Sequence, residues 1–166
     1  MKKLFLGVIM GAAVVGLTAC GSDKKEDNKK EDTGRKTAFT ISCEAKPEKE
    51  NGMTQTSKAI YSFDKEQYVT EYEITMTSKF DKEETYKTYR DEAKEAEKTS
   101  NTSAISYKVT SDDKAKTLTI KYGIDLRKED PKTQQDPDVY KAANVLKEHK
   151  KDATCKVEGI KESEIK

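Results

Sequence analysis

The chain has 166 residues, of which 38% are charged, and its 32 lysines and arginines almost balance its 31 aspartates and glutamates. A net charge of +1 gives no summed electrostatic attraction to nucleic acid, so the composition argues against that class of partner. With 33% hydrophobic residues and no tryptophan, the chain has material for one small domain with a thin core.

The first 19 residues have the pattern of a signal peptide. A positive start, Met1-Lys2-Lys3, precedes a short apolar run over residues 4–15. The segment ends in Leu17-Thr18-Ala19-Cys20, which resembles the lipobox of bacterial lipoproteins. The resemblance implies cleavage between Ala19 and Cys20 and a diacylglyceryl lipid on the Cys20 sulfur, and two acyl chains hold a protein on a membrane without spanning it. An uncleaved anchor helix is the alternative, for which the apolar run is short.

Residues 20–36 predict a disordered, charged tether. Beyond the lipidated cysteine the segment has no apolar side chain to bury, so it cannot offset the entropy cost of ordering itself. A polybasic lipid-binding segment is the alternative, and interspersed acids such as Glu26 and Glu31 argue against it. One folded domain is expected over residues 37–160, followed by a frayed tail at 161–166.

Two cysteines remain once lipid occupies Cys20, and they lie near the two ends of the expected domain. Outside the cytoplasm such a pair usually forms a disulfide, so we expect a bridge between Cys43 and Cys155. Two free buried thiols and a metal pair are the alternatives, and no C-x-x-C motif or histidine cluster favours metal. We therefore expect no bound metal and no cofactor.

Alternation of apolar and polar residues predicts the first strands. Residues 37–44 read as a strand, residues 45–52 as a charged turn, and residues 54–63 and 68–76 as a β-hairpin with a turn at 64–67. The residues expected on the apolar faces of these strands are Phe39, Ile41, Cys43, Ala59, Tyr61, Phe63, Tyr68, Thr70, Tyr72, Ile74 and Met76.

A helix is expected to follow, with Asp81 as its N-cap and Glu84 completing a capping box. Its apolar residues recur at helical spacing and form one narrow stripe: Tyr86, Tyr89, Ala93 and Ala96. We expect this stripe to pack on the core, and a partner-binding face is the alternative.

Period-two alternation returns at residues 105–109 and 118–124 and predicts a second hairpin. The residues expected on the apolar faces of its strands are Ile105, Tyr107, Val109, Leu118, Ile120, Tyr122 and Ile124. Asp136 and Pro137 are expected to open a second helix as N-cap and first residue. A short last strand at 154–157 would bring Cys155 to Cys43. The residues of the second helix expected to face inward are Val139, Ala142, Ala143 and Leu146.

This order of elements predicts the fold class α+β, with an antiparallel sheet built from two hairpins and two helices packed on one face. Several stretches together resemble the YehR-like small bacterial lipoproteins, a domain family of unknown function. The resemblance rests on the lipobox, on Ala59-Ile60-Tyr61-Ser62-Phe63-Asp64, on the helix around residues 83–97, and on Ile105-Ser106-Tyr107-Lys108-Val109 and Leu118-Thr119-Ile120-Lys121-Tyr122. It implies an α+β domain on a lipid anchor and brings no catalytic residues to this chain.

No catalytic residue can be singled out. His149 is the only histidine, and its charged neighbours predict a solvated side chain rather than a base or a ligand. The chain also lacks a glycine-rich phosphate loop. An acidic loop lacks the residue order of an EF-hand, so we expect it to be solvated, with a weak surface Ca²⁺ site as the alternative. The loop consists of Asp125, Glu129, Asp130, Asp136 and Asp138.

The sequence thus indicates the cellular location of the protein more clearly than its activity. We expect a protein held on the extracytoplasmic face of the cell membrane by the lipid on Cys20, in an envelope of Gram-positive type as its Lys-, Glu- and Thr-rich composition suggests. The first hypothesis is a non-catalytic binding or interaction module for an envelope protein or a small ligand. The alternatives are a structural or envelope-maintenance lipoprotein and, less favoured, an enzyme with an unrecognised site.

Overall fold

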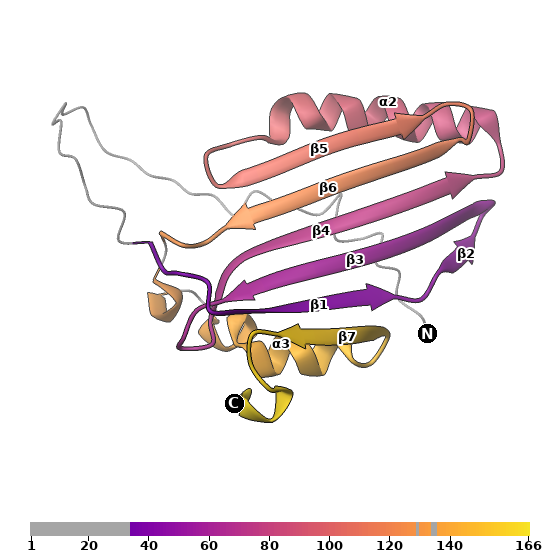
Figure 1. The fold of residues 1–166 in the computed structure, drawn as a ribbon. Coiled ribbons are helices and arrows are strands. Elements are labelled where there is room, and N and C mark those ends of the chain that lie inside the picture. Colours follow the sequence, from indigo (N-terminus) through magenta and orange to yellow (C-terminus); the bar gives the residue numbers. More distant parts are fainter. Residues whose placement is uncertain (1–33, 129, 134–135) are drawn as a thin grey trace, which may run out of the picture. The chain divides into compact units, whose positions relative to one another are not determined.

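The computed structural model describes residues 34–128, 130–133 and 136–166. The predictions for the signal peptide, for Ala19 and Cys20, and for most of the tether lie outside these residues. The described part contains one antiparallel sheet and two α-helices, which confirms the predicted α+β class (Figure 1).

The main path of the seven-stranded sheet is β5-β6-β4-β3-β1-β7, and β2 pairs with β3 beside it. Both predicted hairpins are present, and pairing of β4 with β6 joins them into one sheet. The strands are β1 (Phe39–Ala45), β2 (Glu48–Glu50), β3 (Met53–Phe63), β4 (Val69–Phe80), β5 (Ile105–Asp112), β6 (Thr117–Asp125) and β7 (Ala153–Glu158). The helices are α2 (Glu83–Ser100) and α3 (Ala142–His149), with short 3₁₀ helices η1 (Pro131–Thr133), η2 (Pro137–Tyr140) and η3 (Glu162–Glu164).

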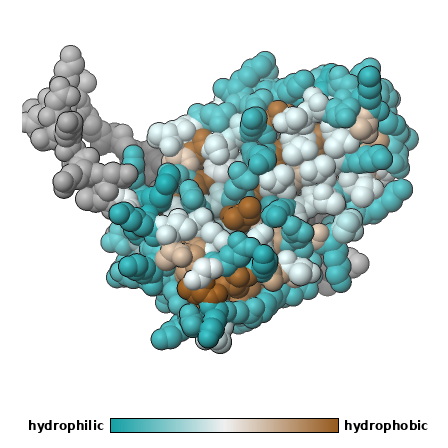
Figure 2. Space-filling model, viewed as in Figure 1, coloured by the Kyte–Doolittle hydropathy of each residue, from teal (hydrophilic) through white to brown (hydrophobic). Residues whose placement is uncertain are grey.

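Both α-helices pack on the same face of the sheet, as predicted. The register aligns Ile41 with Tyr61 and Tyr61 with Tyr72, so the apolar residues of successive strands share one side. In the view of Figure 1, α2 lies behind β5 and β6, and α3 lies behind β7. The opposite face carries mostly Thr, Ser, Lys and Glu, and Figure 2 shows it as largely hydrophilic or neutral with separate hydrophobic patches. The period-two pattern of the strands arises because one face of the sheet packs against the helices and the other faces solvent.

Each helix covers its own core cluster. Under α3, the buried residues include Ile41, Phe63 and Leu146, and under α2 they include Phe80 and Tyr86. Tyr86 and Phe63 have no exposed surface. The two clusters lie at different parts of the same sheet face, which leaves the middle of that face between them.

A β-bulge changes the predicted alternation at the start of β4. Phe63 pairs with Val69, whereas Ser62 pairs with Glu71, so Thr70 is the extra residue. Val69 therefore faces the core in place of Tyr68. Thr70 is fully buried, and its hydroxyl donates to the Ser62 carbonyl at 3.1 Å. The sequence pattern did not reveal the bulge, because Tyr68 and Val69 are both plausible residues for the core face at the start of β4.

The helix starts differ from the predictions. Lys82, not Asp81, is the N-cap of α2, and no side chain caps that end. Asp136 and Pro137 do begin a helical turn, but it is the 3₁₀ helix η2, and α3 begins only at Ala142. Val139 consequently lies on η2 with 55% of its surface exposed, and Val145 takes the buried place on α3. The predicted charged turn at 45–52 also contains the short strand β2.

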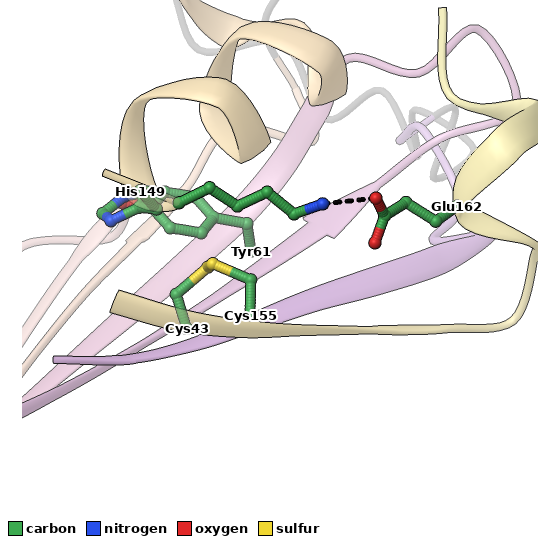
Figure 3. The surroundings of a disulfide bond; sticks show 6 residues. Cys43, Tyr61, His149, Cys155 and Glu162 are labelled. Carbon is green, nitrogen blue, oxygen red and sulfur yellow. Dashed lines mark hydrogen bonds and ion pairs between the residues drawn. A yellow bond between two sulfur atoms is a disulfide. The ribbon is translucent and has the colours of Figure 1, made fainter. Parts of the chain in front are cut away.

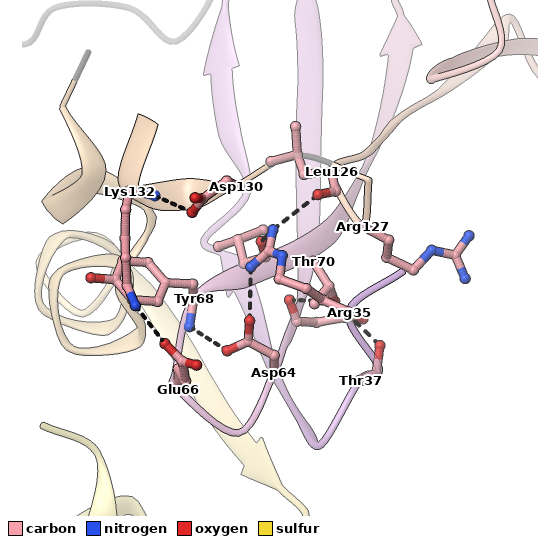
Figure 4. Close-up of polar contacts among 12 residues, drawn as sticks. Arg35, Thr37, Asp64, Glu66, Tyr68, Thr70, Leu126, Arg127, Asp130 and Lys132 are labelled. Carbon is pink, nitrogen blue, oxygen red and sulfur yellow. Dashed lines mark hydrogen bonds and ion pairs between the residues drawn. The ribbon is translucent and has the colours of Figure 1, made fainter. Parts of the chain in front are cut away.

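Ordered contacts begin before residue 37. Arg35, which we had placed in the tether, donates from Nη1 to Asp64 at 2.8 Å and from Nη2 to the carbonyls of Val69 and Leu126 at 2.8 and 2.9 Å (Figure 4). Only 19% of the Arg35 side chain and 11% of the Asp64 side chain are exposed. The guanidinium thus joins the first described residues to the start of β4 and to the loop that follows β6.

The last six residues, which we expected to fray, make specific contacts. Ile165 packs against the core cluster under α3. The Gln67 side chain donates to the Glu164 carbonyl at 2.8 Å and accepts from the Lys166 backbone N–H at 2.7 Å. The tail is therefore attached to the loop between β3 and β4.

Candidate functional site

The predicted disulfide is present. Cys43 on β1 and Cys155 on β7 lie directly opposite each other in the antiparallel register, and their sulfur atoms are bonded (Figure 3). The bridge joins an inner strand to an edge strand across 112 positions of sequence. Of the residues predicted as sites, this pair is the one that the described part of the chain contains.

Beside the disulfide lies a contact that the sequence did not predict. The Tyr61 hydroxyl on β3 and Nε2 of His149, the last residue of α3, are 2.8 Å apart (Figure 3). The two rings also stack obliquely, with centroids 5.2 Å apart. His149 is only partly exposed, so the prediction of a fully solvated histidine is wrong. The end of α3 turns the ring onto the sheet, away from its charged sequence neighbours.

From Tyr61 a row of aromatic rings crosses the sheet. The centroid of Tyr61 is 5.7 Å from that of Tyr72 on β4, Tyr72 is 6.3 Å from Tyr122 on β6, and Tyr122 is 6.4 Å from Tyr107 on β5. We call these four tyrosines together with His149 the tyrosine row. Each ring is placed by the period-two alternation of its strand, and the register aligns the four strands.

The tyrosine row occupies the middle of the helix-covered face. Tyr61, Tyr72 and Tyr122 are partly exposed, whereas the side chains under the helices, such as Phe80 and Ile41, are almost completely buried. No hydroxyl of the row is sealed from solvent without a hydrogen-bond partner, since among the described residues only Arg35 Nε is in that position. The row therefore presents three partly exposed tyrosines, and Tyr107, which is 8% exposed, closes its β5 end.

Partial burial keeps the row uncharged. Burial raises the pKa of the Tyr61 hydroxyl, and burial together with the neighbouring phenols of Tyr122, Tyr61 and Tyr140 raises the pKa of Tyr72 strongly. Burial also raises the pKa of Tyr107, and nearby Glu97 adds to the effect. Burial lowers the pKa of His149, against a smaller opposing effect of Glu148. The surroundings thus favour the uncharged forms of Tyr61, Tyr72, Tyr107 and His149.

The open face of the sheet holds a different feature, a hollow of about 420 Å³ between Glu71, Glu73 and Asp125. Its carboxylates already have cationic partners. Arg127 lies 2.6 Å from Asp125 and 3.8 Å from Glu71, and Lys121 lies 3.3 Å from Glu73. Hydrogen bonds from Arg127 lower the pKa of Asp125 to about 2. The hollow thus has little spare negative charge with which to attract a cation.

A second hollow, of about 520 Å³, lies at the loop between β3 and β4 and is lined by four lysines. Two of them are already paired: Lys132 with Glu66 at 3.2 Å and Lys141 with Asp138 at 2.9 Å. Across the described ranges, no three His, Cys, Asp or Glu side chains are grouped closely enough to hold a metal ion. The tyrosine row is therefore the feature with the most distinctive chemistry.

The sequence contained part of the signal for this row. Tyr61, Tyr72, Tyr107 and Tyr122 were each assigned to an apolar strand face, and that assignment is confirmed by the register. The sequence did not show that the helices leave these rings uncovered, nor that His149 joins them.

Comparison with known proteins found no matching family model, no similar curated protein and no similar solved structure.

Proposed function

We propose that this protein is a lipid-anchored, extracytoplasmic binding module without catalytic activity, and that the tyrosine row is its binding surface. The observation that carries the proposal is the position of the row: the rings of Tyr61, Tyr72 and Tyr122 lie partly exposed between two buried core clusters, and the row ends at the buried Tyr107. The YehR-like resemblance of the sequence implies the lipid anchor and the α+β domain, and the binding role is inferred from the row.

Two independent observations support the proposed extracytoplasmic location. The lipobox ending at Cys20 is a sequence feature, and the Cys43–Cys155 disulfide is a structural one. Disulfides persist in oxidising environments outside the cytoplasm, so the bridge agrees with an exported protein. None of the helices in the described ranges is long and apolar enough to cross a membrane.

The binding role follows from what the row exposes. Aromatic side chains offer a large apolar body and, in tyrosine, a polar tip, which is why they are frequent in binding surfaces. The row spans four strands of one sheet, and the disulfide and α3 hold its Tyr61 end in place. A rigid surface of this kind binds without a large loss of side-chain freedom.

The chemistry of the row favours binding over catalysis. In a catalytic triad, a carboxylate orients the histidine and a nucleophile lies within its reach. The hydrogen-bond partner of His149 in the described structure is the Tyr61 hydroxyl. A buried tyrosine with a raised pKa is a poor nucleophile at neutral pH.

The lipid anchor and the extracytoplasmic location are tested with the full-length chain and its Cys20→Ser variant, both expressed in a bacterium. Membrane-extracted wild type should have lost residues 1–19 and gained lipid mass, and its two remaining cysteines should react with an alkylating agent only after reduction. The Cys20→Ser protein should keep residues 1–19, because the lipid is required before the cut. Wild type without lipid mass would contradict the anchor.

The binding role is tested by retention on envelope fractions. Detergent-extracted wild type, a Tyr72→Ala/Tyr122→Ala variant and a Tyr89→Ala control are each mixed with purified cell wall and with membranes. Tyr89 is also a partly exposed tyrosine near 36% exposure, but it lies on α2 outside the row. Wild type and control should be retained on one fraction, and the double variant should not. Equal retention of all three proteins, with thermal melts showing that all are folded, would contradict the role of the row.

A further inference from the structure

The chemistry of the tyrosine row restricts the kind of ligand it can take. We propose, on the basis of the binding role inferred above, that the row binds an uncharged sugar chain along the sheet, with successive sugar rings lying on successive tyrosines. The argument has three steps, which concern charge, polarity and length.

The strands offer a charged ligand no counter-charge on this face, and the charge near Tyr107 comes from Glu97 of α2. By register, the helix-side positions of β1 and of β3 to β7 carry no Lys, Arg, Asp or Glu. The lysines and glutamates of the strands, such as Lys121 and Glu73, lie on the opposite face. Removing an ion from water without a partner is costly, so the row selects against charged ligands.

A wholly apolar ligand would also fit poorly. The three partly exposed tyrosines of the row carry hydroxyl groups, and each hydroxyl can donate one hydrogen bond and accept two. An apolar helix or acyl chain laid over them would remove their water without replacing its hydrogen bonds, which costs free energy. The ligand must therefore bring hydroxyl or amide groups of its own.

A sugar ring combines the two properties that remain. It has a face of C–H groups that can lie against an aromatic ring, and a rim of hydroxyls that can pair with phenol and imidazole. The pairing suits Tyr61 and His149, which stand 2.8 Å apart at one end of the row. Binding sites of small ligands show this same mixture of aromatic surface and few polar groups.

The length of the row favours a chain over a single sugar. Three partly exposed rings, those of Tyr61, Tyr72 and Tyr122, follow one another at centroid distances of 5.7 and 6.3 Å, which is comparable to the size of one sugar unit. Each further unit of an oligosaccharide would reach another ring of the row. Affinity should therefore increase with the number of sugar units until the row is filled.

The test uses full-length lipidated protein in detergent micelles and soluble oligomers of N-acetylglucosamine. Because the chain has no tryptophan, its ultraviolet emission comes from its eight tyrosines, four of which form the row. We expect the tetramer to bind at least about tenfold more tightly than the dimer, and an oligogalacturonate of equal length to bind more weakly than either. Tyr122→Phe should weaken tetramer binding about threefold to tenfold, the range for one lost hydrogen bond. Tyr122→Ala should abolish binding, and Tyr89→Phe should leave it unchanged.

Failure of this inference can be told apart from failure of the binding role. If the Tyr72→Ala/Tyr122→Ala variant loses its retention on an envelope fraction but no neutral oligosaccharide binds wild type, the row is a binding surface for another ligand and the sugar assignment is wrong. Tighter binding of the anionic oligomer, or full binding by Tyr122→Ala, would also overturn it.

Discussion

The Tyr61 hydroxyl and Nε2 of His149 are in hydrogen-bonding contact at 2.8 Å although 88 positions separate the two residues in the sequence. The contact ties the end of α3 to the C-terminal end of β3, one strand away from the Cys43–Cys155 bridge. It also leaves the only histidine partly buried, whereas its sequence neighbours Glu148 and Lys150 are exposed.

Stability should decrease as the pH falls from about 7 to about 5, because of His149. The fold favours the neutral imidazole and so lowers its pKa from the usual value of about 6.5. The stabilising contribution of the neutral imidazole is therefore complete above the pKa of the unfolded state. It is lost as the pH falls below that value, because the unfolded chain then binds a proton that the folded chain does not yet bind. Urea unfolding at both pH values should show the decrease, and His149→Gln should reduce it.

The single histidine allows a direct check of that prediction. A proton NMR titration has one imidazole signal to follow, and its midpoint should lie below that of a histidine in a short peptide. A midpoint at or above the peptide value would show that burial does not control His149.

Removing the disulfide should lower the free energy of unfolding by about 4–5 kcal/mol, the chain-entropy value for a loop of roughly 100 residues. Cys43 is 2% exposed and packs in the core cluster under α3, so Cys43→Ala/Cys155→Ala is the variant that changes packing least. Urea unfolding of the variant, and of wild type with and without reductant, measures the effect. Identical midpoints for oxidised and reduced protein would contradict a stabilising bridge.

Arg35→Ala should destabilise the domain by about 3 kcal/mol. The change removes three hydrogen bonds and leaves Asp64, whose side chain is 11% exposed, without its cationic partner. The neighbouring Lys36 is exposed, so Lys36→Ala is a matched control that removes the same charge and should cost less than about 0.5 kcal/mol. Thermal or urea unfolding compares the two, and equal effects would show that Arg35 acts only through its charge.

Two glycines should respond differently to alanine. Gly159 follows β7 with φ of +102°, and a Cβ there would lie 3.0 Å from Phe39 Cβ and 3.1 Å from the Ala38 carbonyl oxygen. Gly159→Ala should therefore cost about 2–3 kcal/mol, because backbone strain and a fixed neighbour combine. At Gly123 the Cβ would meet the Ser106 hydroxyl at 2.7 Å, and that side chain can rotate. Gly123→Ala should lower the free energy of unfolding by less than about 1 kcal/mol. The urea unfolding midpoints of the two variants measure the difference.

The sequence alone allowed the fold class, both hairpins, the last strand and the cysteine pair to be predicted. These features depend on local patterns: strands with one buried face alternate every second residue, and an even cysteine pair in an exported chain forms a bridge. The strand faces of Ile41, Phe63, Tyr72 and Leu118 were assigned from alternation, and the register agrees.

Only the tertiary structure revealed the bulge at Thr70, the contacts of Arg35 and the tail, the exposure of Val139 and the burial of His149. Each of these depends on a partner far away in sequence, such as Tyr61 for His149 or Leu126 for Arg35. The tyrosine row has the same origin. Alternation places each ring on the inner face, but the distance between the two helices on that face decides which rings remain uncovered, and a local pattern carries no information about that distance.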